Sequence, residues 1–257
     1  MSHLSAAQSP SAEPIIVTSE PFIGGGVLGS VGIPPRPDTG GSATSVPRSQ
    51  HALGLAELHA AEQTLVGTMA EAQRTAFIAG RRALRAAMCT VAPELNAVAL
   101  LRTGRGAPQI PNGFTGSISH KRSRAIALFA PSAGALVGVD LEERPKESDA
   151  GRPSIADRIL TGAEREVIRE LDPLAHREAT LIRFAIKEAV YKSIDPYVHR
   201  YVRFTEVELD VHADGRATVR LTLPESSIRE VVVHAHWRLE DRWIVAMARS
   251  QLQKTTM

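Results

Sequence analysis

The same order of sequence patterns occurs twice along this chain, and that order most constrains its fold. On each side of a short segment containing proline and glycine, residues 131–134, helical patterns precede strand-like patterns. Apolar residues recur at three- and four-residue steps over residues 51–88 and again within 176–193, as expected of helices that bury one face. We therefore predict an α+β chain of two pseudo-symmetric halves, residues 51–135 and 136–250.

The two ends of the chain are predicted to lie outside these halves. Residues 1–50 are rich in serine, proline and glycine, a composition typical of flexible segments. Two short apolar pieces within that stretch, residues 15–17 and 27–28, could still dock as strands. Residues 251–257 are expected to form a tail.

Local signals set the expected ends of the helices in the second half. Thr161 and Glu164 form a capping-box pattern, which predicts a helix from there to about Pro173. The longer helix at 176–193 is expected to stop before Pro196, since proline lacks the backbone N–H that a helix requires.

Composition excludes several classes of protein. The chain has 257 residues with 30 basic and 28 acidic side chains, and a net charge of +2 does not favour nucleic acid as a partner. A single cysteine, Cys89, excludes an internal disulfide framework and a cysteine-rich zinc site, and suits a reducing compartment. No apolar run approaches 18 residues, and the first residues lack a secretory signal pattern. We expect a cytoplasmic protein with no membrane span.

The segment 136–142, Leu-Val-Gly-Val-Asp-Leu-Glu, carries the first candidate site. As a strand it places its apolar residues on one face and Asp140 and Glu142 together on the other, at the strand's end. Neighbouring carboxylates repel unless positive charge lies between them, and Mg²⁺ prefers carboxylate oxygens. From spacing alone, two unrelated acids on a half-solvated edge strand remain an alternative.

A helix further along carries a matching set. Glu188 and Lys192 lie on the flank of its apolar face. A surface ion pair between them would be worth about 0.3 kcal/mol, but it would not explain why both residues lie toward the core side. A third carboxylate reaching Asp140 and Glu142 would explain this position. Two of the five lysines of the chain, Lys187 and Lys192, fall here, which indicates that a compact ammonium is required.

Basic residues gather in three further places: on the first-half helix, in the loop after it and after His120. They are Arg81, Arg82 and Arg85; Arg102 and Arg105; and Lys121, Arg122 and Arg124. Each group by itself is typical of a solvated surface. Together with a metal ion held by carboxylates, they fit a site for a polyphosphate.

Four segments in order complete the pattern: GRRALRAAM, GRGAPQIPNGFTGSISH, GVDLE and FAIKEAVYK. With these segments the chain resembles the 4′-phosphopantetheinyl transferase superfamily over residues 55–250. It is similar to the surfactin-synthetase-activating type, and closer to the enterobactin-synthetase-component branch.

The resemblance implies a fold of two pseudo-symmetric α/β subdomains with the active site and coenzyme A between them, in a monomer. It implies holo-[acyl-carrier-protein] synthase activity: transfer of 4′-phosphopantetheine from coenzyme A to a serine of an acyl or peptidyl carrier protein, with release of adenosine 3′,5′-bisphosphate. The branch suggests carriers of secondary metabolism, siderophore synthesis among them. A non-catalytic module that binds coenzyme A or a carrier protein, and a metal-dependent phosphoesterase, are the alternatives.

The resemblance also implies the catalytic residues. Asp140, Glu142 and Glu188 would hold Mg²⁺ on the diphosphate. Glu188 would in addition accept the proton of the incoming serine, directly or through water. Lys192 would stabilise the leaving oxygen, and Lys187 would help to hold the phosphates.

The remaining residues of the resemblance concern the binding of coenzyme A. Ser119 and His120 would contact its phosphates, and Arg81 and Arg85 would bind its 3′-phosphate and adenine end. Two positions stay open. The family often has a basic residue where this chain has Ala107, and Arg105 is the candidate to replace it. Glu164 fits either an acid of the site or a helix cap.

Overall fold

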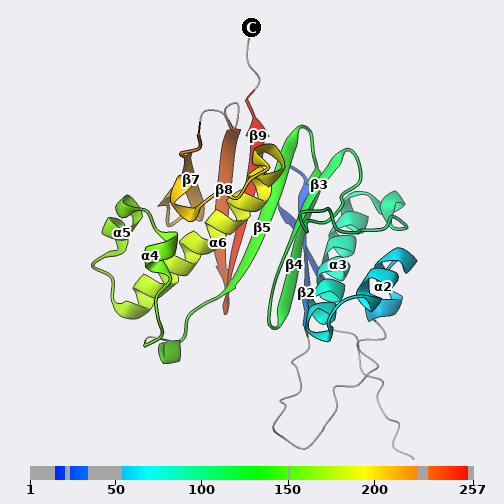
Figure 1. The fold of residues 1–257 in the computed structure, drawn as a ribbon, viewed down its shortest axis with the longest axis horizontal. Coiled ribbons are helices and arrows are strands. Elements are labelled where there is room, and N and C mark those ends of the chain that lie inside the picture. Colours follow the sequence, from blue (N-terminus) through cyan, green and yellow to red (C-terminus); the bar gives the residue numbers. More distant parts are fainter. Residues whose placement is uncertain (1–14, 21–23, 34–53, 150, 225–230, 254–257) are drawn as a thin grey trace, which may run out of the picture.

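Two antiparallel sheets, one from each half of the chain, lie side by side in a computed structural model that describes residues 15–20, 24–33, 54–149, 151–224 and 231–253 (Figure 1). The first sheet has the order β1-β2-β4-β3 and the second β5-β9-β8-β7-β6. The strands are β1 (Ile15–Glu20), β2 (Gly26–Gly32), β3 (Phe114–Lys121), β4 (Arg124–Pro131), β5 (Ala135–Glu143), β6 (Val207–Val211), β7 (Arg216–Leu221), β8 (Val231–Glu240) and β9 (Trp243–Leu252).

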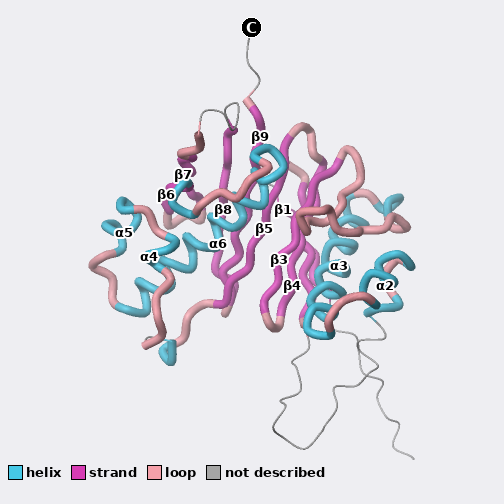
Figure 2. Tube along the Cα trace, in the orientation of Figure 1, coloured by secondary structure: helices cyan, strands magenta, loops and turns pink. Residues whose placement is uncertain are grey.

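One long helix packs against each sheet (Figure 2). The helices are α2 (Ala60–Gly67), α3 (Glu71–Val91), α4 (Ala156–Ile159), α5 (Gly162–Ile168) and α6 (Pro173–Val198), with 3₁₀ turns at Pro93–Leu95, Glu147–Asp149 and Phe204–Glu206. Helix α3 covers the first sheet and α6 the second, and a third apolar cluster fills the space between the sheets. None of the described helices is long and apolar enough to cross a bilayer.

The two halves repeat one arrangement, which confirms the predicted pseudo-symmetric fold. In the first half, β2 pairs with β4 and β4 with β3; in the second, β5 pairs with β9 and β9 with β8. Each half also brings its long helix onto a strand glycine. A Cβ added at Gly29 would lie 2.1 Å from the carbonyl oxygen of Ala83, and one at Gly138 would lie 1.9 Å from that of Ala189. Only glycine permits this close approach of helix and strand.

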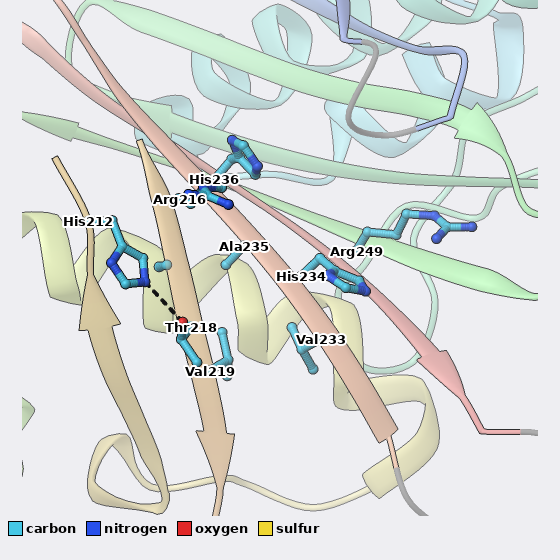
Figure 3. A pocket seen from close by; sticks show the side chains of 10 residues that line it. His212, Arg216, Thr218, Val219, Val233, His234, Ala235, His236 and Arg249 are labelled. Atoms are coloured by element: carbon cyan, nitrogen blue, oxygen red, sulfur yellow. Dashed lines mark hydrogen bonds between the residues drawn. The ribbon is translucent and has the colours of Figure 1, made fainter. Parts of the chain in front are cut away.

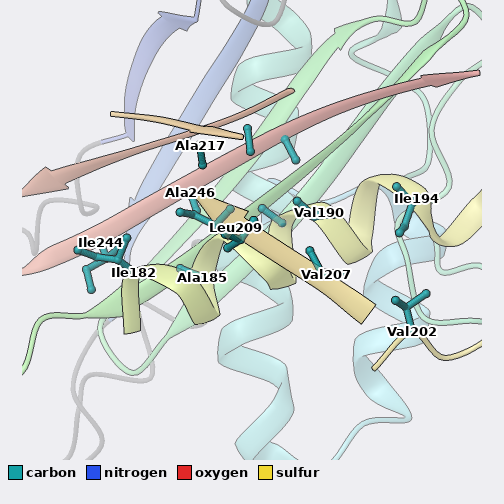
Figure 4. Packing of buried hydrophobic residues seen from close by; sticks show 14 of the residues in the cluster. Ile182, Ala185, Val190, Ile194, Val202, Val207, Leu209, Ala217, Ile244 and Ala246 are labelled. Atoms are coloured by element: carbon teal, nitrogen blue, oxygen red, sulfur yellow. The ribbon is translucent and has the colours of Figure 1, made fainter. Parts of the chain in front are cut away.

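The second core shows how α6 is held. Its apolar side chains pack on the sheet among small residues of β7 and β9 (Figure 4). Ala185 and Ile186 are fully buried, as are Ala246 and Ala248 opposite them. Burial of this face fixes the rotation of α6 about its axis, because the helix is apolar on only that side. The flank that carries Glu188 and Lys192 is thereby turned toward β5.

The predicted boundary at residue 50 is wrong for part of the N-terminal segment. Residues 15–20 and 26–32 form β1 and β2, as their apolar pattern allowed, and β2 is almost wholly buried. Its central position in the first sheet, between β1 and β4, explains that burial. Residues 1–14, 21–23 and 34–50 of the predicted flexible segment lie outside the described residues, as do residues 254–257. The predicted tail begins too early, because β9 runs to Leu252.

The ends of α6 also differ from the prediction. Asp172 and Pro173, taken as a stop for the preceding helix, begin α6: the Asp172 carboxylate caps the first turn, and a proline in the first helical position loses no hydrogen bond. At the other end α6 passes Pro196 and ends at His199, whose φ is +52°. Pro196 lies in the last turn, where the loss of one backbone bond is tolerated. The capping box of Thr161 is confirmed.

Three hydroxyl groups join the two halves where the sheets meet. Strand β3 lies at the edge of the first sheet and β5 at the edge of the second. The backbone N–H groups of Val137, Val139 and Leu141 donate to the hydroxyls of Thr115, Ser117 and Ser119 at 3.1, 3.1 and 3.3 Å. All six residues are buried. This hydroxyl ladder supplies the partners that an edge strand otherwise lacks.

Replacing Ser117 by alanine should destabilise the fold by about 1–3 kcal/mol, because the buried N–H of Val139 then has no acceptor. The free energy of unfolding in urea measures the effect. Thr90→Ala is the matched control: it removes an exposed hydroxyl on α3 and should change stability by less than about 0.5 kcal/mol. Equal stability of the two variants would show that the hydroxyl ladder contributes nothing.

Candidate active site

Asp140 lies in β5 with its carboxylate buried at the junction of the two halves. One oxygen, Oδ1, accepts hydrogen bonds from Ser119 Oγ at 2.8 Å and from Lys192 Nζ at 2.7 Å. The same ammonium donates to the carbonyl oxygen of Val139 at 3.0 Å, which fixes α6 to β5. The other oxygen, Oδ2, is buried and has no hydrogen-bond partner among the described residues. A buried carboxylate oxygen without a donor is unfavourable, and a cation would satisfy it.

Glu142 follows two residues later on the same face of β5. Its side chain is only 9% exposed and pairs with Lys121 of β3, with Nζ and Oε1 2.7 Å apart. Burial raises the pKa of this carboxyl to about 7, against the lowering effect of Lys121. The ion pair is therefore insufficient to restore the ordinary acidity of the group.

Glu188 of α6 belongs to the same group of charges. Burial raises the pKa of its carboxyl, and the negative charge of Asp140 raises it further, while Lys192 and Lys121 act in the opposite direction. The strand and helix predicted from the sequence therefore bring Asp140 within reach of the charge of Glu142 and of the charge of Glu188. Three carboxylates share two ammonium groups, so the cluster lacks positive charge.

The acidic residues of the cluster are of the type that binds a metal ion, but their side chains do not converge as a set of ligands. In the described part of the chain, no group of three or more histidine, cysteine or acidic side chains is arranged to hold a metal ion. Asp140 Oδ2 is nevertheless unpartnered, and the negative charge of Asp140 acts on the partly buried Glu188 nearby. These observations fit a hard cation on oxygen ligands. The magnesium site stays a prediction.

A cavity of about 310 Å³ lies beside this cluster, between the two halves. Four of the predicted residues line it: Arg81 and Arg105 with His120 from the first half, and Lys192 from the second. His120 reaches it from the face of β3 opposite to the hydroxyl ladder. Burial lowers the pKa of His120, and the nearby positive charges of Lys192 and Lys121 lower it further. Arginines of the first half and Lys192 of the second thus line the cleft with positive charge, as a polyanionic ligand requires, while His120 is held toward its neutral form.

Arg81 and Arg102 lie on the ring of Phe77 in this cleft, with guanidinium carbons 4.4 and 5.0 Å from the ring centre. Arg81 donates to the carbonyl oxygens of Leu100 and Leu101, and burial lowers its pKa to about 10. Arg102 has no hydrogen bond or ion pair from its guanidinium among the described residues. Its free donors face the cleft, a role that the sequence alone did not single out.

Arg105, the candidate to replace the family's basic residue at Ala107, is bound to an acidic side chain. Its guanidinium makes a bidentate ion pair with Asp195 of α6, and the pKa of Arg105 is raised by that hydrogen bond. Both partners line the cleft, so the pair joins the two halves across it. The ion pair uses Nε and Nη2 of Arg105, and a phosphate would compete with Asp195 for this guanidinium.

The prediction for Lys187 is wrong, and that for Arg85 stays a prediction. Lys187 is 1% exposed, and its ammonium donates to Glu164 Oε2 at 2.7 Å and to the carbonyl oxygens of Ile159 and Phe204 at 2.8 and 3.0 Å. Its three donors are used, so none is left for a phosphate. Arg85 lies outside the cleft, where it pairs with the buried Glu62 at 2.7 Å.

Two other residues have roles different from those expected. Ser119 is buried in the hydroxyl ladder and donates to Asp140, so its action on a ligand is indirect. The Glu164 carboxylate caps α5 by accepting from the N–H of Thr161, and it also accepts from Lys187 and from the N–H of Leu209. The choice left open for Glu164 is therefore decided in favour of the helix cap, with the buried ion pair added.

A second cavity, of about 550 Å³, is separate from this cleft (Figure 3). It lies at β7, β8 and β9 and contains His212, His234, His236, Arg216 and Arg249. The one hydrogen bond drawn there joins His212 Nε2 to Thr218 Oγ1 at 3.0 Å. None of the described residues that line it is acidic, and none was predicted as a site residue.

Comparison with known proteins gives the family. Residues 136–248 match the 4′-phosphopantetheinyl transferase superfamily, and residues 61–130 match the 4′-phosphopantetheinyl transferase N-terminal domain. The chain is 30% identical over 161 residues to the 4′-phosphopantetheinyl transferase Npt of Nocardia iowensis, which covers 62% of this chain and 69% of that protein. The chain belongs to the 4′-phosphopantetheinyl transferase superfamily. The resemblance predicted from its four segments is confirmed.

Two further members of this transferase superfamily are similar over shorter or weaker matches. Svp of Streptomyces mobaraensis is 32% identical over 130 residues, covering 49% of this chain and 50% of Svp. PptT of Mycobacterium tuberculosis is 26% identical over 174 residues, covering 65% of this chain and 73% of PptT. Both are named 4′-phosphopantetheinyl transferases. The two matched family regions of this transferase lie on either side of the junction at residues 131–134, and the cleft lies between them.

The Lys187→Met variant of this transferase should be destabilised by about 3–5 kcal/mol, because Glu164 is then left as an unpaired buried charge. Urea unfolding measures this loss, and the double variant Lys187→Met with Glu164→Gln should regain part of it. Lys146→Met, which removes an exposed lysine, is the control. If the Lys187→Met variant has normal stability but binds coenzyme A more weakly, the predicted role of Lys187 in binding phosphate would be supported instead.

Proposed function

We propose that this protein transfers 4′-phosphopantetheine from coenzyme A to a serine of an acyl or peptidyl carrier protein and releases adenosine 3′,5′-bisphosphate. The observation that carries the proposal is the meeting of Glu188 and Lys192 with Asp140 and Glu142 beside a cleft lined by cations. The naming of its relatives as 4′-phosphopantetheinyl transferases supports the same reaction.

Coenzyme A would lie in the cleft with its anionic groups among the basic side chains. Arg81 and Arg102 of the first half and Lys192 of the second supply positive charge on both sides, and His120 would contribute a ring N–H as a hydrogen-bond donor. Charge-assisted hydrogen bonds of this kind are the strongest contacts that a phosphate can make with a protein. Binding from both halves would also hold the diphosphate in one orientation, which lowers the entropy cost of the reaction.

Asp140, Glu142 and Glu188 would hold a magnesium ion, whose contribution when bound is to neutralise the charge of the diphosphate oxygens. Glu188 would accept the proton of the carrier serine, and its raised pKa brings it closer to neutral pH, where a general base works best. As the serine oxygen bonds to phosphorus, the bond from phosphorus to the bridging oxygen breaks. Lys192 would stabilise the charge that forms on that leaving oxygen.

The carrier protein would dock beside the end of β5, at residues 144–159. Basic side chains line a cavity of about 490 Å³ there, among them Arg122, Arg144 and Arg177. Carrier proteins are usually acidic helical bundles, so such a surface is complementary in charge. We expect a cytoplasmic monomer that serves carriers of secondary metabolism, including siderophore synthesis.

Mass spectrometry of a purified carrier domain incubated with the full chain, coenzyme A and Mg²⁺ tests the proposal. A mass gain of one phosphopantetheine group per carrier supports it. An unmodified carrier with intact coenzyme A would instead favour a binding module, and an unmodified carrier with hydrolysed coenzyme A would favour a phosphoesterase.

Glu188→Gln should keep the fold and lower the rate of transfer by about 10²–10⁴-fold, the range for removal of a general base. The amide preserves size and hydrogen bonding but cannot accept the proton. The measurement is the rate of holo-carrier formation, with circular dichroism as the control for folding. A rate within threefold of the wild type would exclude Glu188 as base and as metal ligand.

Arg102→Ala should weaken the binding of coenzyme A by about tenfold, as expected for one lost charge-assisted hydrogen bond. Isothermal titration calorimetry gives the dissociation constant. Arg82→Ala is the matched control, because Arg82 carries the same charge on α3 but pairs with Glu57 and does not line the cleft. Equal dissociation constants for the Arg102 variant and the wild type would contradict the role of Arg102.

A further inference from the structure

Lys121 contacts a carboxylate of the proposed metal site although nothing in the reaction proposed above requires it. It is the last residue of β3, opposite Arg124 in the tight hairpin with β4. Side chains of β3 at every second position face β5, and Lys121 follows Ser119 in that series. Lys121 therefore reaches Glu142 for the same geometric reason that Ser119 reaches Asp140, with Nζ and Oε1 2.7 Å apart.

The two lysines of the cluster differ in what they leave free. Lys192 binds one oxygen of Asp140, and the second oxygen of Asp140 stays without a partner. Lys121 instead binds Glu142, a carboxylate on the side of the cluster toward the β3–β4 turn. The Lys121 ammonium occupies Oε1 of Glu142, and a divalent ion bound to the same carboxylate would be repelled by this neighbouring positive charge. Lys121 and the ion therefore compete for this carboxylate.

Lys121 can also leave its partner without losing solvation. Its side chain is 38% exposed, in contrast to Lys187, which is wholly enclosed. A lysine on a flexible four-carbon stem can swing its ammonium into water. Displacement of Lys121 thus requires no rearrangement of the backbone.

We infer that Lys121 is an internal counter-ion that competes with the divalent cation for Glu142 and so weakens metal binding by the free protein. This inference rests on the proposed function, because the metal site belongs to the proposed reaction. The geometry of the ion pair agrees with it, since Lys121 Nζ and Glu142 Oε1 are 2.7 Å apart. Removal of the ammonium should leave Glu142 available to the metal ion.

The test is the affinity of the full chain for Mn²⁺, without coenzyme A, by isothermal titration calorimetry. Lys121→Met, which keeps the length of the side chain, should bind Mn²⁺ about tenfold more tightly than the wild type. Lys121→Arg, which keeps the charge, should stay within threefold. Lys146→Met is the matched control for net charge: Lys146 is exposed and its nearest acid is Glu143, at 4.0 Å, so Mn²⁺ affinity should not change.

Unchanged or weaker Mn²⁺ binding by Lys121→Met would overturn the inference, as would equal tightening by Lys146→Met. If Lys121→Met fails to fold, as seen by circular dichroism, Lys121→Gln gives the same measurement with a polar side chain. The carrier assay with saturating Mg²⁺ separates the two proposals. If the wild type transfers phosphopantetheine but Lys121→Met leaves the affinity for Mn²⁺ unchanged, only this inference fails. If the wild type shows no transfer, the proposed function fails.

Discussion

The hydroxyl ladder between β3 and β5 is the interaction on which the rest of the site depends. It fixes the register of one half against the other, because each hydroxyl accepts from one backbone N–H of β5. Ser119 is thereby placed at Asp140 and Lys121 at Glu142, while His120, on the other face of β3, lines the cleft. A shift by one residue would exchange the two faces and separate the basic residues from the acidic ones.

The second constraint is the close contact of α6 with β5. Gly138 lets the backbone of α6 approach β5 so nearly that a Cβ would overlap the carbonyl oxygen of Ala189. The buried pair of Lys187 and Glu164 holds the other side of the same helix to α5 and to the loop before β6. Glu188 lies between these two attachments. Removing one member of a buried ion pair destabilises a protein by more than the intact pair stabilises it. The pair of Lys187 and Glu164 therefore fixes the position of α6 but adds little net stability to the fold.

Periodicity was sufficient to predict the two halves, their long helices, and the carboxylates of β5 and α6, since each depends on the spacing of residues within one element. It could not assign Lys187, which lies further round α6 from the apolar face than Lys192, because only the chain packed against that side of the helix decides whether the lysine is enclosed. Arg102 and Arg105 lie three residues apart in one loop, and their different partners, Phe77 and Asp195, come from other elements. The prediction that a helix ends near Asp172 and Pro173 was incomplete for a related reason, since the same two residues can end one helix or begin the next.

The charges of the cleft differ in how strongly water screens them. The Arg105 side chain is exposed, so solvent weakens its attraction to Asp195. A phosphate that offers Arg105 another partner can therefore compete with Asp195. Asp140 is buried and Glu188 is half-buried, so their interaction with charge is stronger. The weak ion pair thus joins the two halves across the cleft, and the strong interactions lie at Asp140, where a diphosphate would react.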